Sequence, residues 1–471
     1  MSDTLMVSVS GVRGLVGTDL TPEVVALWAA AFGTWAKDGS RERGARGGKR
    51  RPAVVLGRDA RTSGPMFARA AMAGLMSVGC DVIDVGLVPT PTVQLAVEHH
   101  RAAGGIALTA SHNPIEWNAL KFVGPDGIYL DGVAGSRLRE LATDGRIGRA
   151  AYDSLGGVAP DAGAIDRHLD AVLKLRDLDV RTIRRRRLRV ALDTVRGAGG
   201  AVMPALLERL GCRVAAINLE TDGRFPRPPE PLPEHLKPLG ALVRRHKADL
   251  GIAVDPDVDR LALVDERGRA IGEDYTLAFA VRAVLGRKAG KREAGSGKRV
   301  VVCNLSTSLV VEDAARDCGA DIVRTPVGEA HVARKMLQLE APIGGEGNGG
   351  VMYPALHVGR DAPVAAALVL GLLAREGKSV GELVAAAPRY AIVKAKVLRG
   401  PRLEPVYAEL RRRFGDAVVD TQDGLRLAWP DRWLHVRPSG TEPIIRLIAE
   451  ASSGSEAERL IEEGRRLCAA S

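Results

Sequence analysis

The 471-residue sequence has few aromatic residues, few cysteines and no long hydrophobic run. Aromatic residues make up only 4% of it, and none belongs to an aromatic RNA-binding motif. Its five cysteines include no C-x-x-C pair, so we expect neither a disulfide framework nor a structural zinc site. The longest apolar stretch, residues 362–374, is well short of the roughly 20 residues of a membrane span. The N-terminus lacks the features of a signal peptide. We therefore expect a soluble, cytoplasmic protein that does not bind membranes.

Basic residues outnumber acidic ones, 67 to 57, which gives a formal net charge of +10. They concentrate in three runs, at 41–51, 181–189 and 286–299. Each run comes just before an apolar, strand-like segment, so we predict solvated connectors. No zinc-finger spacing or recognition-helix pattern accompanies them, and we expect no binding to nucleic acid. A basic balance is also suited to anionic small-molecule substrates.

One pattern occurs three times along the chain. An apolar, β-rich run leads into a small polar loop, a helix, and a second strand that opens with Gly beside Cys. Strand–helix–strand repeats of this size indicate parallel strands with crossover helices, and thus three related α/β domains. The repeats cover residues 51–64 and 79–86, 188–200 and 211–219, and 298–308 and 318–328.

The C-terminal part has a different, α+β pattern. It predicts a helix over 406–414, a hairpin over 424–438 that turns at Pro430-Asp431, a strand over 444–451 and a final helix over 455–469. The predicted architecture is three similar mixed α/β domains followed by a C-terminal α+β domain. The predicted boundaries are 1–155, 156–267, 268–387 and 388–471.

The first loop with chemical potential follows an apolar strand in the segment 104–114. It places Ser111 where a strand ends, which is where α/β folds put their reactive groups. The loop is not a hydrolase nucleophile elbow, because Thr109 and Asn113 replace the glycines of G-x-S-x-G. Taken alone it could be only a turn. Ten residues on, Lys121 could exchange a proton or simply be solvated.

A second loop carries three carboxylates at alternate positions, on Asp255, Asp257 and Asp259. Three carboxylates so close repel one another unless a cation joins them, and hard oxygen ligands select Mg²⁺ or Ca²⁺. An EF-hand is excluded, because Arg260 occupies the position that needs glycine and the flanks are strand-like. Open coordination positions favour Mg²⁺ that also touches a phosphate. A solvated acidic turn is the alternative.

Two further loops could bind a substrate. In 344–354 the spacing G-x-G-x-x-G occurs, but a strand-like segment follows, so no helix receives a pyrophosphate. Glu346 and Asn348 in this loop instead suggest contacts to sugar hydroxyls. Arg437, Ser439, Gly440 and Thr441 form a turn with the donors that a phosphate requires, although the chain has no P-loop. Either loop could also be an ordinary turn.

Taken together and in this order, these loops resemble those of the α-D-phosphohexomutase superfamily. The sequence TASHNP at 109–114 and the form DPDVDR at 255–260 carry most of the resemblance, which covers nearly the whole chain. A further Gly-rich loop at 10–17 contains Arg13. The resemblance implies four domains around one central cleft.

The resemblance also implies roles for individual residues. Ser111 would be the phosphorylated serine, flanked by His112, and Lys121 the general acid and base. Asp255, Asp257 and Asp259, with an oxygen of the Ser111 phosphate, would hold Mg²⁺. Arg260 would steady the transferring phosphoryl group, and Arg13 would support the serine pocket. Glu346 and Asn348 would bind the sugar, while Arg437, Ser439, Gly440 and Thr441 would hold the phosphate that does not react.

The implied reaction interconverts hexose 6-phosphate and hexose 1-phosphate through a 1,6-bisphosphate, which would also serve as activator. The sugar loop departs from the common family pattern, Gly-Glu-x-Ser-Gly-His, because Asn348 and Gly350 replace its Ser and His. Glu329 stands where some members carry His. The loop looks most like that of phosphoglucosamine mutases, and a phosphomannomutase/phosphoglucomutase is the alternative. We expect hexose phosphates as the partners of a monomer or homodimer.

Overall fold

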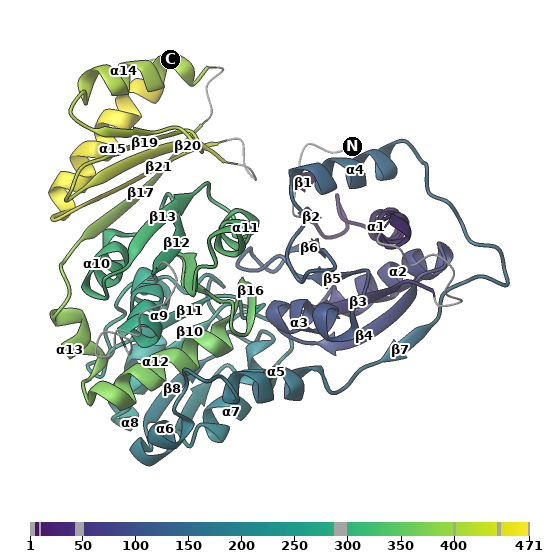
Figure 1. Cartoon of the computed structure of the whole chain (residues 1–471), viewed down its shortest axis with the longest axis horizontal. Helices are drawn as coiled ribbons and strands as arrows, with labels where there is room; N and C mark the ends of the chain where they lie inside the picture. Colours follow the sequence, from purple (N-terminus) through teal and green to yellow (C-terminus); the bar gives the residue numbers. More distant parts are fainter. Residues whose placement is uncertain are drawn as a thin grey trace.

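The computed structural model describes residues 5–8, 11–42, 51–286, 299–398, 402–439 and 444–469, with the side chains of 41, 42 and 469 excepted. Its strands form four separate sheets, one in each of four successive parts of the chain (Figure 1). We call these parts unit I (residues 5–160), unit II (164–264), unit III (274–385) and unit IV (391–469). Among the described residues, no helix is long and apolar enough to cross a membrane.

Unit I contains a mixed seven-stranded sheet of order β1-β2-β6-β5-β3-β4-β7. The strand β3 pairs in parallel with both β4 and β5, whereas β6 and β2 are antiparallel to their neighbours. The sheet extends past residue 155, where the sequence placed the end of the first domain, because β7 pairs with β4. Its strands are β1 Met6–Ser8, β2 Gly11–Leu15, β3 Ala53–Arg58, β4 Asp81–Leu87, β5 Gly104–Leu108, β6 Trp117–Val123 and β7 Val158–Pro160, and its helices are α1 Pro22–Glu42, α2 Gly64–Ser77, α3 Thr90–His100 and α4 Gly132–Thr143.

Unit II contains a four-stranded sheet of order β11-β10-β8-β9, in which β8 is parallel to both β10 and β9. The strands are β8 Arg189–Asp193, β9 Arg213–Ile217, β10 Leu250–Val254 and β11 Leu261–Val264. The helices are α5 Ala164–Leu173, α6 Val180–Arg186, α7 Gly199–Arg209 and α8 Lys237–His246, with a short 3₁₀ helix, η1 Pro233–His235.

One basic run was wrongly predicted to be a connector. Residues 180–186 form α6, because the Asp179 side chain accepts a hydrogen bond from Thr182 N, Ile183 is buried, and Val180 packs against the same core. The other two predicted connectors lie largely outside the described residues, at 43–50 and 287–298.

Unit III has a five-stranded sheet of order β13-β12-β14-β15-β16. The strands β13 and β14 are parallel to β12, and β15 and β16 continue as antiparallel strands. The strands are β12 Val300–Asn304, β13 Asp321–Thr325, β14 Ile343–Glu346, β15 Gly350–Tyr353 and β16 His357–Arg360; the helices are α9 Asp274–Leu285, α10 Leu309–Asp317, α11 Glu329–Leu339, α12 Ala362–Glu376 and α13 Val380–Ala385. The three predicted strand–helix–strand repeats are confirmed as parallel pairs, β3 with β4, β8 with β9, and β12 with β13.

Units II and III share one hydrophobic core. The helix α12 contains the whole of the longest apolar stretch of the sequence, and its buried residues include Val364, Leu368 and Leu372. A helix that is apolar all round has no face for water and is found inside a fold. Its burial fixes the orientation of units II and III. Unit II carries the aspartate loop, residues 255–260, and unit III carries the glycine loop, residues 347–349.

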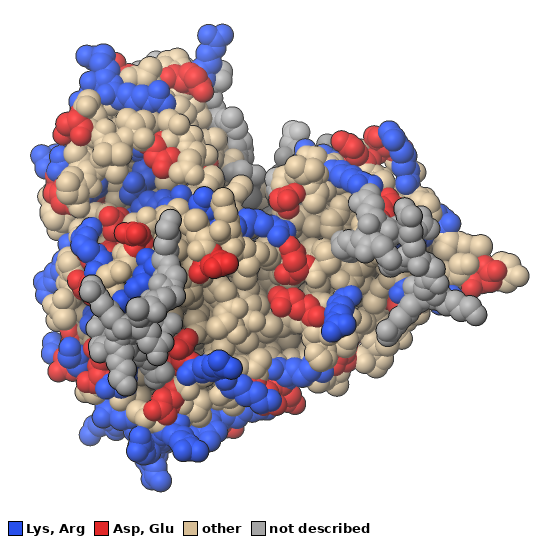
Figure 2. Space-filling model, viewed as in Figure 1, with Lys and Arg blue, Asp and Glu red and all other residues tan. Residues whose placement is uncertain are grey.

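Unit IV has an antiparallel sheet of order β17-β21-β20-β19-β18. Its strands are β17 Ala391–Leu398, β18 Val418–Asp420, β19 Leu425–Ala428, β20 Trp433–Pro438 and β21 Ile444–Ala451, and its helices are α14 Glu404–Arg413 and α15 Gly454–Ala469. The predicted hairpin, strand and helices of the C-terminal part are confirmed. Unit IV has its own core, and a notch separates its surface from that of unit I (Figure 2).

Candidate active site

The serine loop follows β5 and carries Ser111 in an unusual backbone conformation. Ser111 has φ of +47°, in the left-handed region that residues other than glycine rarely occupy, and its side chain is buried. Its Oγ donates a hydrogen bond of 2.8 Å to Asp255 Oδ2, and His112 Nδ1 lies 3.3 Å from the same Oγ. The structure therefore directs the Ser111 hydroxyl into the aspartate loop of unit II.

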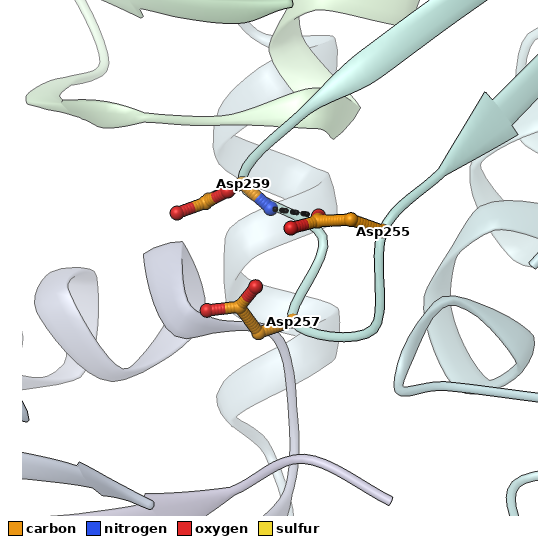
Figure 3. Close-up of side chains that lie close together, drawn as sticks. All are labelled: Asp255, Asp257 and Asp259. Carbon is orange, nitrogen blue, oxygen red and sulfur yellow. Dashed lines mark hydrogen bonds between the residues drawn. The ribbon is translucent and has the colours of Figure 1, made fainter. Parts of the chain in front are cut away.

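The aspartate loop joins β10 to β11 and turns sharply. Asp255, Asp257 and Asp259 extend from it toward the same space (Figure 3), and the amide of Asp259 donates to Asp255 Oδ1 over 3.2 Å. Between them Val258 has φ of +60°, an unusual conformation for a β-branched residue. Backbone bonds from Val258 N to Asp255 O and from Ala362 N to Val258 O hold this turn. Such local strain is commonly stored where a loop must present functional groups.

The three carboxylates are fully buried and could together hold a metal ion, since one oxygen of each lies within 4.8 Å of the others. Two of their oxygens, Asp257 Oδ1 and Asp259 Oδ1, are buried without a hydrogen-bond partner. Burial raises the pKa of Asp255 well above its usual range, and the charges of Asp259 and Asp257 raise it further. Burial and the two neighbouring carboxylates thus disfavour the ionised form of Asp255, which a cation among the three would favour.

Lys121 lies on β6 and faces this cluster. Its Nζ is 2.7 Å from Asp257 Oδ2 and 3.8 Å from Asp259 Oδ2. Burial raises the pKa of Asp257, but Lys121 and hydrogen bonds from it and from Thr90 outweigh burial and bring the pKa below the usual range. One amine therefore lies within reach of both carboxylates and of any group that they bind.

Two predicted arginines border the cluster. Arg260 Nη1 bonds to Glu230 Oε1 at 2.9 Å, and its Nε lies 3.8 Å from Asp259 Oδ1 without a hydrogen-bond partner. Arg13 Nη1 donates to Asn113 Oδ1 on the serine loop at 2.5 Å. Burial, together with the positive charges of Arg260 and Arg13, lowers the pKa of His112 well below its usual range, so its ring is neutral at pH 7.

The glycine loop connects β14 to β15 and buries Glu346. Its carboxylate accepts hydrogen bonds from Asn304 Nδ2 at 2.8 Å and Arg360 Nη1 at 2.7 Å. Asn348 is half-buried, and its Oδ1 accepts from Gly350 N at 3.2 Å. Burial raises the pKa of Glu346, but the charge of Arg360 and the bond from Asn304 bring it below the usual value. Glu346 is therefore ionised and fixed in orientation.

Arg360 connects the glycine loop to the aspartate loop. Besides Glu346, its guanidinium donates to Asp259 Oδ2 at 2.5 Å and Glu329 Oε2 at 3.0 Å. Glu329 in turn accepts from Gln94 Nε2 of unit I at 3.1 Å. One buried cation thus holds carboxylates from three segments of units II and III, and through Glu329 reaches unit I.

The predicted phosphate loop lies in unit IV. Arg437 Nε donates to Asp423 Oδ2 at 2.8 Å, and Ser439 N donates to Ile444 O at 2.8 Å. None of the contacts described for Arg437 joins it to Ser111 or the aspartates. Gly440 and Thr441 lie outside the described residues.

Comparisons with known proteins agree with this arrangement along the chain. The models of phosphoglucomutase/phosphomannomutase alpha/beta/alpha domains I, II and III match residues 5–145, 166–268 and 273–390, and the model of the C-terminal domain matches 393–467. The chain is 41% identical to "Phosphoglucomutase/phosphomannomutase" of Thermococcus kodakarensis, with 97% of each chain covered. The chain belongs to the phosphoglucomutase/phosphomannomutase family.

Two other members of the family define the similarity further. The chain is 37% identical to "Probable phosphoglucosamine mutase" of Methanopyrus kandleri, covering 96% of this chain and 95% of that one. A crystal structure of a phosphoglucomutase/phosphomannomutase family protein from Burkholderia thailandensis matches with a TM-score of 0.83 and 27% identity, covering 99% of this chain and 97% of that one. Membership makes the chain a phosphohexomutase, an isomerase of the phosphotransferase type, and confirms the predicted resemblance and fold class.

The structure brings most of the predicted site residues of this phosphohexomutase into one region. Ser111 contacts Asp255, Lys121 contacts Asp257 and Asp259, and one oxygen of each aspartate lies within 4.8 Å of the others. Glu346 joins them through Arg360, which the sequence did not single out. It also did not single out Arg61, which contacts the serine loop. Arg360 ends the buried strand β16, and Arg61 lies just after β3. Because α/β folds place functional groups at strand ends, this position could have identified both arginines from the sequence.

Proposed function

We propose that this enzyme interconverts hexose 6-phosphates and hexose 1-phosphates through a phosphoserine at Ser111 and a hexose 1,6-bisphosphate, with glucosamine phosphates as its preferred substrates. The observation that carries the proposal is the hydrogen bond from Ser111 Oγ to Asp255 beside two further buried aspartates. The Ser111 hydroxyl can carry a phosphoryl group beside these carboxylates only if the negative charge of that group is neutralised.

The aspartate loop fits a Mg²⁺ ion as the source of that neutralisation. Two of its oxygens, Asp257 Oδ1 and Asp259 Oδ1, are hard ligands that accept no hydrogen bond. Asp255, Asp257 and Asp259 would hold the ion, with a phosphate oxygen on Ser111 as a further ligand. When bound, Mg²⁺ offsets the negative charge that spreads over the phosphoryl oxygens during transfer.

The side chains of this chain supply positioning and a proton path. In the first transfer the Oγ–P bond of phosphorylated Ser111 breaks and the sugar hydroxyl oxygen bonds to phosphorus, and one proton passes in net from that hydroxyl to Ser111 Oγ. We propose that Lys121 Nζ takes up the proton of the sugar hydroxyl. Arg260 faces the same region, and its Nε has no hydrogen-bond partner. The bisphosphate then presents its other phosphate, which returns to Ser111 by the reverse steps.

Substrate contacts follow from the two remaining loops. The ionised Glu346 and the neighbouring Asn348 would bind sugar hydroxyls. Arg437, Ser439, Gly440 and Thr441 would hold the phosphate that is not reacting, because a guanidinium, hydroxyls and backbone amides suit a dianion. The notch between units I and IV is the opening through which we expect the sugar phosphate to enter (Figure 2).

The preference for an amino sugar rests on charge around the glycine loop. The buried carboxylates of Glu329 and Glu346 both form ion pairs with Arg360, which also pairs with Asp259. Because these three carboxylates share one guanidinium, we propose that they favour an ammonium group on the sugar over a hydroxyl. The relative from Methanopyrus kandleri, named a probable phosphoglucosamine mutase, is consistent with this preference, whereas the name of the Thermococcus relative points to glucose and mannose.

The test is to compare kcat/KM for glucosamine, glucose and mannose 1-phosphates, with Mg²⁺ and a catalytic amount of hexose 1,6-bisphosphate present. We expect at least a tenfold preference for glucosamine 1-phosphate, about 1.4 kcal/mol of differential transition-state binding. A preference for glucose or mannose would identify a phosphoglucomutase/phosphomannomutase and overturn the amino-sugar assignment. No turnover of any of the three would overturn the proposed reaction.

A further inference from the structure

We propose that Arg61 is a positioning residue of the reaction, whose guanidinium holds the serine loop in the one conformation that directs Ser111 Oγ at Asp255. The inference rests on the proposed function, since it assumes that Ser111 carries the phosphoryl group. Arg61 follows β3, is fully buried, and lies 50 positions before Ser111 in the chain.

All five N–H groups of Arg61 are used, and four of them point at one loop. Nη2 donates to the carbonyls of Ser111 at 2.7 Å and Asn113 at 2.6 Å. Nη1 donates to the carbonyls of Pro114 at 2.6 Å and Trp117 at 2.8 Å. The planar fork of an arginine is the side chain that can bond several carbonyls at once from a fixed position. Four carbonyls of the segment from Ser111 to Trp117 thus accept hydrogen bonds from one guanidinium.

The fifth bond anchors the guanidinium to the strand edge. Nε donates to Asp59 Oδ2 at 3.2 Å, and the same oxygen accepts from Thr109 Oγ1 at 2.7 Å. Thr109 Oγ1 in turn accepts from Ser111 N at 2.9 Å. Asp59 therefore fixes both the cation and the residue that begins the loop, and both amide and carbonyl of Ser111 are bonded to this assembly.

These bonds explain how Ser111 keeps its left-handed conformation. The left-handed region is unfavourable for residues other than glycine because their Cβ crowds the following carbonyl oxygen, so without external bonds the loop would relax. Relaxation would rotate Oγ away from Asp255, because the direction of the Cα–Cβ bond follows the backbone. The bonds from Arg61 and Thr109 offset the strain and keep Oγ at 2.8 Å from Asp255.

Unit II covers this assembly from outside. The ring of Phe225 lies over the Arg61 guanidinium, 5.1 Å from ring centroid to Cζ. Beside it Gly223 packs so tightly on the carbonyl of Ala60 that an added Cβ would lie 2.2 Å from that oxygen. Excluding water strengthens the hydrogen bonds of Arg61. Unit II therefore carries Asp255 and also covers Arg61, the cation that positions Ser111.

The experiment compares Arg61→Lys with Arg375→Lys. The control arginine also bonds backbone carbonyls, those of Ala283 and Arg282, but it joins α12 to α9 away from the serine and aspartate loops. Both exchanges keep the charge. For each variant we would measure Tm, kcat and KM with hexose phosphate, and the rate at which hexose 1,6-bisphosphate phosphorylates the dephosphorylated chain, followed by intact mass.

We expect Arg61→Lys to lower kcat and the phosphorylation rate by a similar factor, at least a hundredfold, with KM changed less than threefold because the sugar and phosphate loops are untouched. Its Tm should fall no more than that of Arg375→Lys, which keeps wild-type kcat. A crystal structure of Arg61→Lys should show Ser111 out of the left-handed region. A kcat within threefold of wild type would overturn the proposal, as would equal loss of kcat in both variants.

If Arg61→Lys does not fold, the variant Asp59→Asn tests the positioning role instead. That exchange weakens the anchor of Arg61 and Thr109 yet leaves the four carbonyl bonds, and we expect a smaller fall in kcat with unchanged KM; wild-type kcat would overturn the proposal. Failure of the proposed function can be distinguished from failure of the positioning role. A wild-type chain that turns over no hexose phosphate overturns that function, while the Ser111 conformation in the Arg61→Lys crystal structure still tests the positioning role.

Discussion

Ser111 Oγ donates a hydrogen bond of 2.8 Å to Asp255 Oδ2, although 144 positions separate the two residues. The bond joins unit I to unit II at the atom that we propose to be phosphorylated. Its geometry therefore depends on how two separately built sheets pack, and on the loops at the ends of β5 and β10. Variants of these loops should change the chemistry more than the stability.

Ser111→Ala should leave the chain folded and remove the phosphoryl carrier. We expect kcat to fall by roughly three orders of magnitude or more, as for other nucleophile deletions, with a small change in Tm. Turnover and intact mass after incubation with bisphosphate would test this, and the variant should gain no phosphoryl group. Ser154→Ala, at an exposed serine of unit I, is the control. Near-normal kcat in Ser111→Ala would contradict the assignment.

Asp257→Asn removes one charge from the proposed metal shell and the partner of Lys121. We expect the Mg²⁺ concentration for half-maximal activity to rise at least about tenfold, a loss seen even for residues outside the ligand shell. Calorimetric titration of the free chain with Mg²⁺ should show the same weakening without reliance on activity. Asp431→Asn, at an exposed residue, should titrate like wild type. Identical Mg²⁺ titrations for both variants would count against the metal loop.

Arg360→Lys should impair sugar and metal binding together. A lysine ammonium cannot hold the carboxylates of Asp259, Glu329 and Glu346 at the same time. Losing a charged hydrogen bond to Glu346 should raise KM for hexose phosphate by roughly ten- to a hundredfold, and the Mg²⁺ requirement should rise with it. Steady-state kinetics at varied sugar and Mg²⁺ would test this. A rise in KM with an unchanged Mg²⁺ requirement would show that Arg360 does not link the two loops.

Asp274 should make the stability of the fold depend on pH. Burial raises the pKa of Asp274 to about 8, and the charges of Glu273 and Glu450 add to the effect against a hydrogen bond from Ser308. The unfolded chain releases this proton near pH 4 (about 3.9 for a free Asp). Between these values the folded state binds more protons, so this residue makes stability fall as pH rises toward 8.

Asp274→Asn should remove that fall while keeping an oxygen to accept from Ser308 N. Relative to wild type, the variant should gain at least about 1.4 kcal/mol in unfolding free energy between pH 5 and pH 9, the equivalent of one pKa unit. Tm measured for both proteins at the two pH values would test the sign. A difference in Tm that does not change with pH would mean that Asp274 is ionised in the fold.

Much of the fold could be predicted because its signals are local. The parallel pair of β8 and β9 follows from an apolar run, a helix and a second run within 30 residues or so. The helix α6 was missed because its basic composition is typical of solvated segments, and its contacts with the core come from two apolar side chains, Ile183 and Val180. Pairings over long distances, such as β2 with β6, have no local signal, since the strands lie about a hundred residues apart.

The sequence by itself determined which groups each loop offers. The alternation of Asp255, Asp257 and Asp259 between two apolar strands is a property of five consecutive residues, and so is the hydroxyl of Ser111 at a strand end. Local geometry suffices for these, because strands and turns leave few conformations for short segments. The family resemblance placed these loops in one enzyme.

Only the tertiary structure decided which groups meet and what holds them there. Arg61 and Arg360 act on loops 50 and about a hundred positions away, where a side chain arrives only after the sheets have packed. Burial of these cations removes competing water and makes their hydrogen bonds directional and strong. The same packing leaves one oxygen each of Asp257 and Asp259 without a hydrogen-bond partner, which the order of residues along the chain does not reveal.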